Sequence, residues 1–372
     1  MIKDGHEVTV LCASGGYATG EKLKTEKLKA EIGEEGRDGE KLKNEAPGSE
    51  EAANCDPRTA NSQAVILRIG ATRFGRGSFL GKLVDYASYY LGVIWKLATM
   101  ETRPDRIIAL TTPPFLSVVA RALSKIRGGQ HAHWVMDLYP DVMVAHGMLG
   151  GGGLSHWGLA SQARWGFGGT RCSGIVTLGP DMAARIEGLM AQGGGGEPRP
   201  AVEWVPLWGT GGKAFGSEET QKVSGARMLR RERGWADDEL VVMYSGNMGL
   251  GHRFGEFLMA AKSLAKERRS EFRFEFFGDG KRRDEIKEFT ASHPHCRIEV
   301  HGYAPAESLG DHLRSADVHL VSLEPSWTGT MIPSKLQGIF AEGRPAIFVG
   351  AAESSIARWV IESGGKKFAS AE

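Results

Sequence analysis

Apolar positions along the 372-residue chain fall into short β-rich runs that alternate with segments of helical periodicity. Turn-forming Gly, Pro, Asn and Asp separate the two kinds of segment. The expected strands lie at 64–70, 106–112, 132–140, 239–246, 272–280, 297–303, 316–323 and 345–350, the last of the series, and the segment 174–189 gives one more strand and helix. The other expected helices are 79–100, 113–125, 252–267, 282–290, 306–315 and one that begins at the Pro-Ser-Lys turn after residue 332.

This alternation indicates parallel sheets that are covered by helices on both faces. The Gly- and Pro-rich stretch 190–200 reads as a linker between two such sets. We therefore predict an α/β fold of two Rossmann-like domains that face each other across a cleft. The predicted domains are 1–200 and 201–372. Ligands of open α/β sheets bind at the carboxyl ends of the strands, so those ends should line the cleft.

The beginning of the chain departs from this pattern. Residues 5–14 (GHEVTVLCAS) read as a turn and a strand, yet no strand, glycine-rich turn and helix precede them. The charged segment 15–60 lacks the apolar residues needed to offset its ordering entropy, and we predict a disordered insertion there.

Composition excludes several classes of protein. The chain has 46 Lys and Arg against 45 Asp and Glu, which gives a nucleic-acid-binding function no overall support. Its four cysteines are far apart and form no Cys-x-x-Cys pair, so their spacing predicts neither a zinc site nor a disulfide framework. Charged residues interrupt the apolar stretch 79–100, and no signal peptide opens the chain. These features predict a soluble, cytoplasmic protein.

The stretch TMIPSKLQGIFAEGRPAIFVG, residues 330–350, contains the clearest candidate chemistry. Ser334 and Lys335 are expected in the first turn of a helix, where the free N–H groups favour an anion rather than a lysine. Either an anion binds there, or the helix is an ordinary capped one with an exposed lysine.

Glycine and small polar residues also occupy several expected strand ends, where a ligand could approach the backbone closely. These loops are Ser245-Gly246-Asn247, Gly278-Asp279-Gly280, Gly302-Tyr303 and Thr328-Gly329-Thr330. The segment GNMGLG lacks the spacing of the dinucleotide fingerprint, and no P-loop motif occurs. Together the loops predict a diphosphate held by backbone amides, with Lys335 and Arg253 neutralising its charge.

Several segments occur in the order found in retaining GT-B glycosyltransferases, and the chain resembles the family 4-like enzymes of bacterial cell-envelope polysaccharide synthesis. The segments are GHEVTVLCAS, VMDLYPDVMVAHGML, VVMYSGNMGLGHRFGEFLMAAKSL, FRFEFFGDGKRRDEI, LRSADVHLVSL and IPSKLQGIFAEGRPAIFVG. The resemblance covers residues 1–14 and 62–365. It implies transfer, with retention, of a hexosyl or N-acetylhexosaminyl group from a nucleotide-sugar donor, usually a UDP-sugar, to a glycan or lipid-linked acceptor. It implies no cofactor and no metal, and the chain has no Asp-x-Asp motif.

The resemblance also assigns roles to individual residues. It places Ser334, Lys335 and Leu336 at the donor pyrophosphate, Gly246 and Asn247 beside the phosphates, Gly302 and Tyr303 near the nucleobase, Gly329 and Thr330 near the transferred hexose, and Asp137 at the reaction centre. By position alone, Asp137 could equally cap the next turn.

The chain departs from the family pattern in ways that matter. Asn247 and His252 stand where many relatives have Arg and Lys, and Arg253 is the candidate replacement for that charge. Thr330 and Gly338 stand where many relatives have two glutamates, one of which grips the ribose, and nearby Glu342 is expected to face solvent. The missing first unit, and an end at 372, resemble a chain truncated at both ends.

Two other functions stay open: a nucleotide-sugar epimerase on the same fold, and a non-catalytic nucleotide-sugar-binding paralogue.

Other residues have no assigned role in these functions. His131 and His133 alternate along a strand and are expected at the surface, and Trp204 and Trp208 are expected to pack in a core or hinge. One basic, aromatic segment suits either a solvated face or the surface of an anionic membrane on its inner, cytoplasmic side. Its residues are Arg68, Arg73, Phe74, Arg76, Phe79, Lys82 and Tyr86.

Overall fold

The computed structural model describes residues 6–13, 65–72, 74, 79–193, 198–207 and 219–369. The chain divides into two compact units, Met1–Glu101 and Thr102–Glu372. The predicted insertion at 15–60, the side chains of Arg73, Arg76 and Phe79, and Trp208 lie outside the described residues.

The first unit contains two strands and one helix. Strand β1 (Thr9–Ala13) pairs in parallel with β2 (Val65–Ile69), and α2 spans Phe79–Thr99, as the apolar pattern predicts. The helix packs closely on β2, since a Cβ added at Gly92 would lie 2.5 Å from Cγ2 of Ile69. Within the described residues, no helix has both the length and the apolar character needed to cross a membrane.

The second unit begins with a four-stranded parallel sheet in the order β3-β4-β5-β6. Its strands are β3 (Arg106–Leu110), β4 (Gln130–Val135), β5 (Cys172–Thr177) and β6 (Val202–Trp204). Its helices are α3 (Leu116–Arg127), α4 (Asp141–Ala145), α5 (Leu154–Phe167) and α6 (Pro180–Ala191). Helix α5 was not predicted, because exposed Trp157 and buried Phe167 lie on different sides and blur the periodicity.

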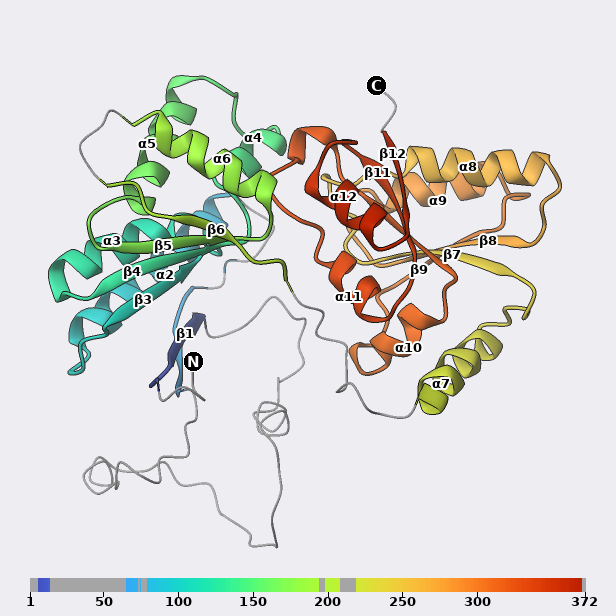
Figure 1. The fold of residues 1–372 in the computed structure, drawn as a ribbon, viewed down its shortest axis with the longest axis horizontal. Coiled ribbons are helices and arrows are strands. Elements are labelled where there is room, and N and C mark those ends of the chain that lie inside the picture. The colour runs from blue at the N-terminus through green and yellow to red at the C-terminus, as the bar shows by residue number, and fades with distance from the viewer. Residues whose placement is uncertain are drawn as a thin grey trace, which may run out of the picture. The chain divides into compact units, whose positions relative to one another are not determined.

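A six-stranded parallel sheet follows in the order β12-β11-β10-β7-β8-β9 (Figure 1). Its strands are β7 (Leu240–Ser245), β8 (Phe272–Phe277), β9 (Ile298–His301), β10 (Val318–Ser322), β11 (Ala346–Gly350) and β12 (Lys366–Ala369). Its helical segments are α7 (Glu219–Glu232), α8 (Gly255–Lys266), α9 (Arg283–Ser292), η3 (Ala306–Ser308), α10 (Leu309–Arg314), η4 (Pro325–Trp327), α11 (Lys335–Ala341) and α12 (Ser355–Glu362). The prediction that 345–350 is the last strand is wrong, because β12 pairs with β11.

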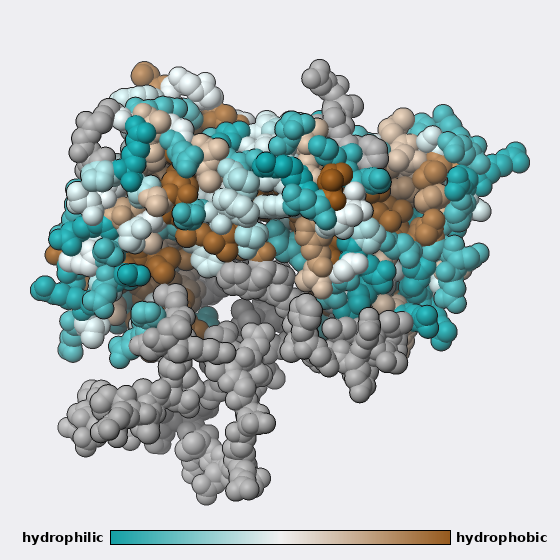
Figure 2. Space-filling view, viewed as in Figure 1, coloured by the Kyte–Doolittle hydropathy of each residue, from teal (hydrophilic) through white to brown (hydrophobic). Residues whose placement is uncertain are grey.

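Helices cover both faces of the six-stranded sheet, which confirms that prediction. Leu320 and Val321 are successive residues of β10 and point into different cores. Leu320 packs with residues of α8 and α9, and Val321 with residues of α10, α11 and α12. Figure 1 shows these helices beside the sheet. On the visible surface, hydrophilic side chains are interspersed with smaller apolar areas, as is usual for a folded protein (Figure 2).

Loops after the four-stranded sheet contact loops of the six-stranded sheet within the second unit. The Leu138 N–H donates to the Thr330 carbonyl (2.8 Å). The Asp181 carboxylate accepts from the N–H and the hydroxyl of Ser355 (2.7 and 2.8 Å). Strand β6 pairs with β5, so residues just after the predicted linker extend the first sheet.

Candidate functional site

The predicted donor-binding residues lie at the carboxyl edge of the six-stranded sheet. Gly246 and Asn247 follow β7, Gly302 and Tyr303 follow β9, and the segment 329–336 connects β10 to α11. The chain runs from β7 outward through β8 and β9, then returns to add β10 on the other side of β7. This arrangement creates a topological switch point between β7 and β10, the place where open α/β sheets bind ligands.

Gly246 leaves room for Lys335 at this switch point. Its φ is 139°, and a Cβ at this position would lie 3.2 Å from Cε and 3.5 Å from Nζ of Lys335. Its N–H donates to the Phe277 carbonyl (2.9 Å), so this amide is not free for a phosphate. What Gly246 contributes is therefore an open approach to the lysine.

The amino group of Lys335 is buried. Its Nζ lies 3.5 Å from the centroid of the Tyr244 ring, and it has no hydrogen-bond partner among the described residues. Burial lowers the pKa of Lys335 well below its ordinary value. The alternative of an ordinary helix with an exposed lysine is therefore wrong. An uncompensated ammonium in such a place is costly, and a bound anion would supply the missing partner.

The other two predicted residues at the start of α11 differ in their surroundings. The Leu336 side chain is buried in a core, and its N–H donates to the Pro333 carbonyl (3.2 Å). Ser334 is exposed and makes no capping hydrogen bond through its side chain. The start of this helix therefore offers mainly the charge of Lys335.

Arg253 is compensated by neighbouring carboxylates. It forms ion pairs with Glu256 (2.6 Å) and Glu324 (3.3 Å). Its backbone exchanges hydrogen bonds with the Ser322 hydroxyl, which links the loop after β7 to the end of β10. These contacts suit a structural role for Arg253. Among the described residues, Lys335 differs from Arg253 in that its amino group has no hydrogen-bond partner.

His252 does not supply the charge that relatives place at its position. Nδ1 lies 2.7 Å from the Ser322 carbonyl oxygen, to which it donates in the neutral tautomer. Burial, with a further contribution from the Lys335 charge, lowers the pKa of His252 to about 3. The imidazole is consequently uncharged at neutral pH.

The loop after β9 is open. A Cβ added at Gly302 would meet nothing within 4 Å, and the Tyr303 side chain is exposed. The Tyr303 hydroxyl donates to the Asp279 carbonyl (3.2 Å), which holds the ring beside the loop after β8. This geometry provides a flat apolar surface next to the sheet edge.

Asp137 lies close to the loop that contains Gly329 and Thr330. The hydrogen bond from the Leu138 N–H to the Thr330 carbonyl joins the two loops. The Thr330 hydroxyl is buried and donates to the Trp327 carbonyl (2.8 Å), so this side chain is occupied. Gly329 has φ 76°, and a Cβ there would lie 2.8 Å from the Asp181 carbonyl oxygen. Burial raises the pKa of Asp137.

Sequence comparison finds two curated relatives, although no protein-family model matches the chain. The chain is 24% identical over 270 residues to "Probable glycosyltransferase WbjE" of Pseudomonas aeruginosa, covering 72% of this chain and 63% of the relative. It is 22% identical over 282 residues to "Putative colanic acid biosynthesis glycosyl transferase WcaI" of Escherichia coli (strain K12), covering 75% and 66%. The matched region thus spans slightly less than two thirds of each relative.

Two solved structures share the architecture. WaaG, a glycosyltransferase involved in lipopolysaccharide biosynthesis, superposes with a TM-score of 0.55 at 13% identity, covering 82% of this chain and 73% of WaaG. HepE of Anabaena, solved with UDP and glucose, gives a TM-score of 0.51 at 14% identity, covering 82% and 72%. The chain has the GT-B fold. The predicted resemblance to GT-B glycosyltransferases of polysaccharide synthesis is confirmed.

Two expectations about side chains of this GT-B protein are wrong. Glu342 does not face solvent, because its carboxylate is largely buried and pairs with Arg314. His131 and His133 are buried in the four-stranded sheet and do not lie at the surface. Trp204 is 46% exposed, so it is not a core residue, and its contact with the Trp359 ring at a centroid distance of 6.2 Å leaves packing at a hinge as the prediction.

Sequence reasoning also missed residues that shape the site. Tyr244 forms the aromatic face against Lys335, and Glu324 joins Arg253 to Arg282. Tyr244 gave no signal because it reads as one more apolar residue of a buried strand. Glu324 follows β10 directly, so the rule that ligands meet strand ends could have identified it.

Proposed function

We propose that this protein is a glycosyltransferase that transfers a sugar from a nucleoside diphosphate-sugar, a UDP-sugar, to a glycan or lipid-linked acceptor. The observation that carries the proposal is the buried Lys335 amino group, which has no hydrogen-bond partner among the described residues and lies at the topological switch point. The names of WbjE, WcaI and WaaG support the reaction class, and the UDP and glucose bound to HepE support the donor class.

The chemistry of such a transfer needs a preformed positive charge. When the bond between sugar and diphosphate breaks, negative charge grows on the leaving phosphate. Lys335 is held in place before the reaction by the Tyr244 ring and by its buried surroundings. A charge in a low-dielectric site stabilises the leaving group more strongly than the same charge in water. The open Gly246 turn gives the phosphates access to it.

The sugar and the acceptor would meet at the loop that contains Asp137. This loop is joined to Thr330, and it borders a small pocket that is lined in part by Thr111 and Tyr139. We propose that Asp137 acts at the reaction centre, and that the sugar is transferred with retention, as the family resemblance implies. Tyr303 and Gly302 would accommodate the nucleobase.

A ligand panel followed by a product assay tests this function. UDP and several UDP-sugars should raise the melting temperature of the protein in proportion to affinity, because ligands that bind the folded state stabilise it. The best donor is then incubated with candidate acceptors, and the products are identified by mass spectrometry. Transfer of the sugar supports the proposal. Rearranged donor without transfer would support an epimerase, and binding without turnover a non-catalytic paralogue.

A lipid-linked acceptor would bring the protein to the inner surface of the membrane. Residues 58–130 carry 11 Lys and Arg against 3 Asp and Glu, and Phe74 within this segment is 68% exposed. Binding to vesicles that contain anionic lipid should then fall steeply as salt is added, because exposed charges are screened. Binding that ignores salt, or no binding, would leave these residues as a solvated face.

A further inference from the structure

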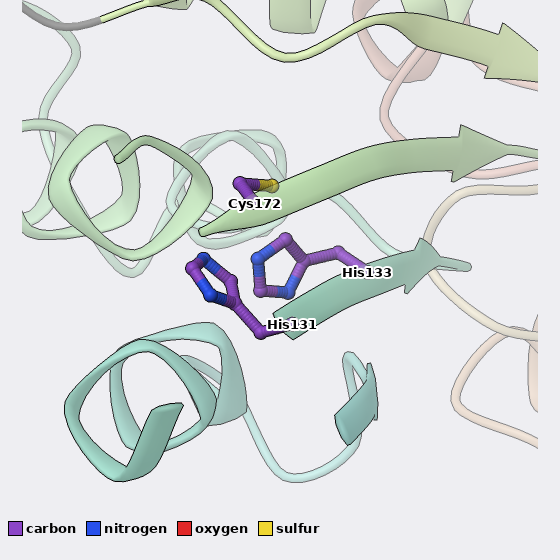
Figure 3. Close-up of side chains that lie close together, drawn as sticks. All are labelled: His131, His133 and Cys172. Atoms are coloured by element: carbon purple, nitrogen blue, oxygen red, sulfur yellow. The ribbon is translucent and has the colours of Figure 1, made fainter. Parts of the chain in front are cut away.

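A second cluster of reactive side chains lies at the amino end of the four-stranded sheet. His131 and His133 lie two residues apart on β4, so both point to the same face. Cys172 begins β5 and is paired in register with His131 (Figure 3). One donor atom from each of the three residues lies within 4.8 Å of the others. This cluster lies at the opposite end of these strands from the Asp137 loop.

Both ring nitrogens of His131 have a hydrogen-bonding neighbour. Nδ1 lies 2.9 Å from the Ser124 hydroxyl, which also lies 2.9 Å from the Arg121 carbonyl oxygen. Nε2 lies 3.3 Å from the Gly168 carbonyl oxygen. When the His131 proton is on Nδ1, Ser124 accepts it and the Nε2 lone pair is available to a metal ion.

The ring nitrogens of His133 lack hydrogen-bond partners within the described residues. This residue is 2% exposed. The Gly166 carbonyl lies near enough to influence its charge, but without hydrogen-bond geometry. Leaving a buried polar group without a partner costs about 1–3 kcal/mol. A ligand that accepts electron pairs from both histidines would remove this cost.

We propose that His131, His133 and Cys172 form a binding site for one thiophilic transition-metal ion, Zn²⁺ or Cu⁺. Two imidazole nitrogens and one thiolate form a donor set suited to either ion. Zinc binds nitrogen at about 2.0–2.1 Å and sulfur at about 2.3 Å, so the donors must approach one another by about 1 Å. Small side-chain rotations achieve this, and half-buried Cys172 gives the ion a route of entry.

Two neighbouring groups act on this site in opposite ways and bear on the choice of ion. Ser124 would orient His131 through its other ring nitrogen, an arrangement common to metal-binding histidines. The buried Arg121 guanidinium acts electrostatically on His131 and Cys172, which disfavours a divalent ion relative to a monovalent one. The ion would join β4 to β5 and would thereby stabilise the sheet.

A cobalt titration of the full chain, first freed of metal by a chelator, tests the site. Co²⁺ should bind with a stoichiometry of one and show a thiolate-to-cobalt charge-transfer band. Cys172→Ser should abolish the band and weaken binding by more than roughly 100-fold, and Ser124→Ala should weaken it by roughly 10–100-fold. Cys296→Ser is the matched control, since Cys296 is a buried cysteine in a core beside the six-stranded sheet, and it should leave binding unchanged.

Competition of Zn²⁺ and Cu⁺ with bound Co²⁺ identifies the preferred ion. If Cys172→Ser fails to fold, X-ray absorption of the zinc-loaded wild-type chain decides, because it should show one sulfur and two nitrogen ligands. A cobalt spectrum without a sulfur contribution would overturn the proposal. The proposal would also be overturned if Cys172→Ser and Cys296→Ser bound Co²⁺ equally well, or if less than one ion bound per chain.

Discussion

Replacing Lys335 with methionine should change ligand affinity and stability in opposite directions. Methionine keeps the length of the side chain and removes the charge, which is buried without a hydrogen-bond partner. The contact with Tyr244 at 3.5 Å offsets about 0.5–2 kcal/mol of the cost of burying that charge. Replacing buried charges by apolar residues of similar volume is often neutral or stabilises by about 1–4 kcal/mol. We expect the ligand-free Lys335→Met protein to be at least as stable as the wild type.

The same substitution should weaken UDP binding. A hydrogen bond to a charged group contributes about 1.5–3 kcal/mol, which corresponds to roughly 10–150-fold in the dissociation constant. Isothermal titration calorimetry with UDP measures this loss, and urea unfolding measures the stability. Lys266→Met is the control, because Lys266 is exposed in the last turn of α8 at the other edge of the sheet.

The pH dependence gives an independent check. Because burial lowers the pKa of Lys335 in the folded state, the unfolded chain binds more protons between that lowered pKa and about 10.4. The lysine therefore makes wild-type stability rise with pH across this window, and Lys335→Met should lack that contribution. UDP favours the charged lysine, so binding should take up protons wherever the free lysine is partly neutral. Unchanged UDP affinity in Lys335→Met, or a marked loss of its ligand-free stability, would refute the reasoning.

Four further substitutions test other parts of the structure. Gly278→Ala should destabilise the protein by more than about 1 kcal/mol in urea unfolding, because φ is 137° and its Cβ would lie 1.9 Å from a carbonyl oxygen. Gly302→Ala meets open space and should stay within about 0.5 kcal/mol. Asp137→Asn should leave UDP affinity nearly unchanged but slow transfer by roughly 100-fold or more in a product assay, whereas equal rates would exclude it from the reaction. Glu342→Ala should cost about 1–3 kcal/mol by leaving Arg314 without its largely buried partner, and a change below 0.5 kcal/mol would contradict that pairing.

Local patterns were enough to determine most of the secondary structure and the edge where the site lies. Alternation of apolar runs located β7, β8 and β10, because burial on both faces of a parallel sheet selects such runs directly. Glycine after a strand end identified the Gly246 turn, whose φ of 139° favours a residue without a side chain. Helices α4, α5, α7 and α12 and strands β6 and β12 were not predicted, and α5 in particular has no single apolar face.

Only the tertiary structure shows whether each charged side chain is buried and whether it has a partner of opposite charge. Nothing near Lys335 in the sequence reveals that its ammonium is buried against Tyr244, because the two residues lie on different elements that meet at the switch point. The sequence alone suggests that Arg253 is a free cation, whereas in the structure it pairs with Glu324, which lies just after β10. The spacing of the cysteines likewise predicts no metal site, yet the pairing of β4 with β5 brings Cys172 to His131. Burial and charge compensation depend on partners distant in sequence, and only the folded chain brings those partners together.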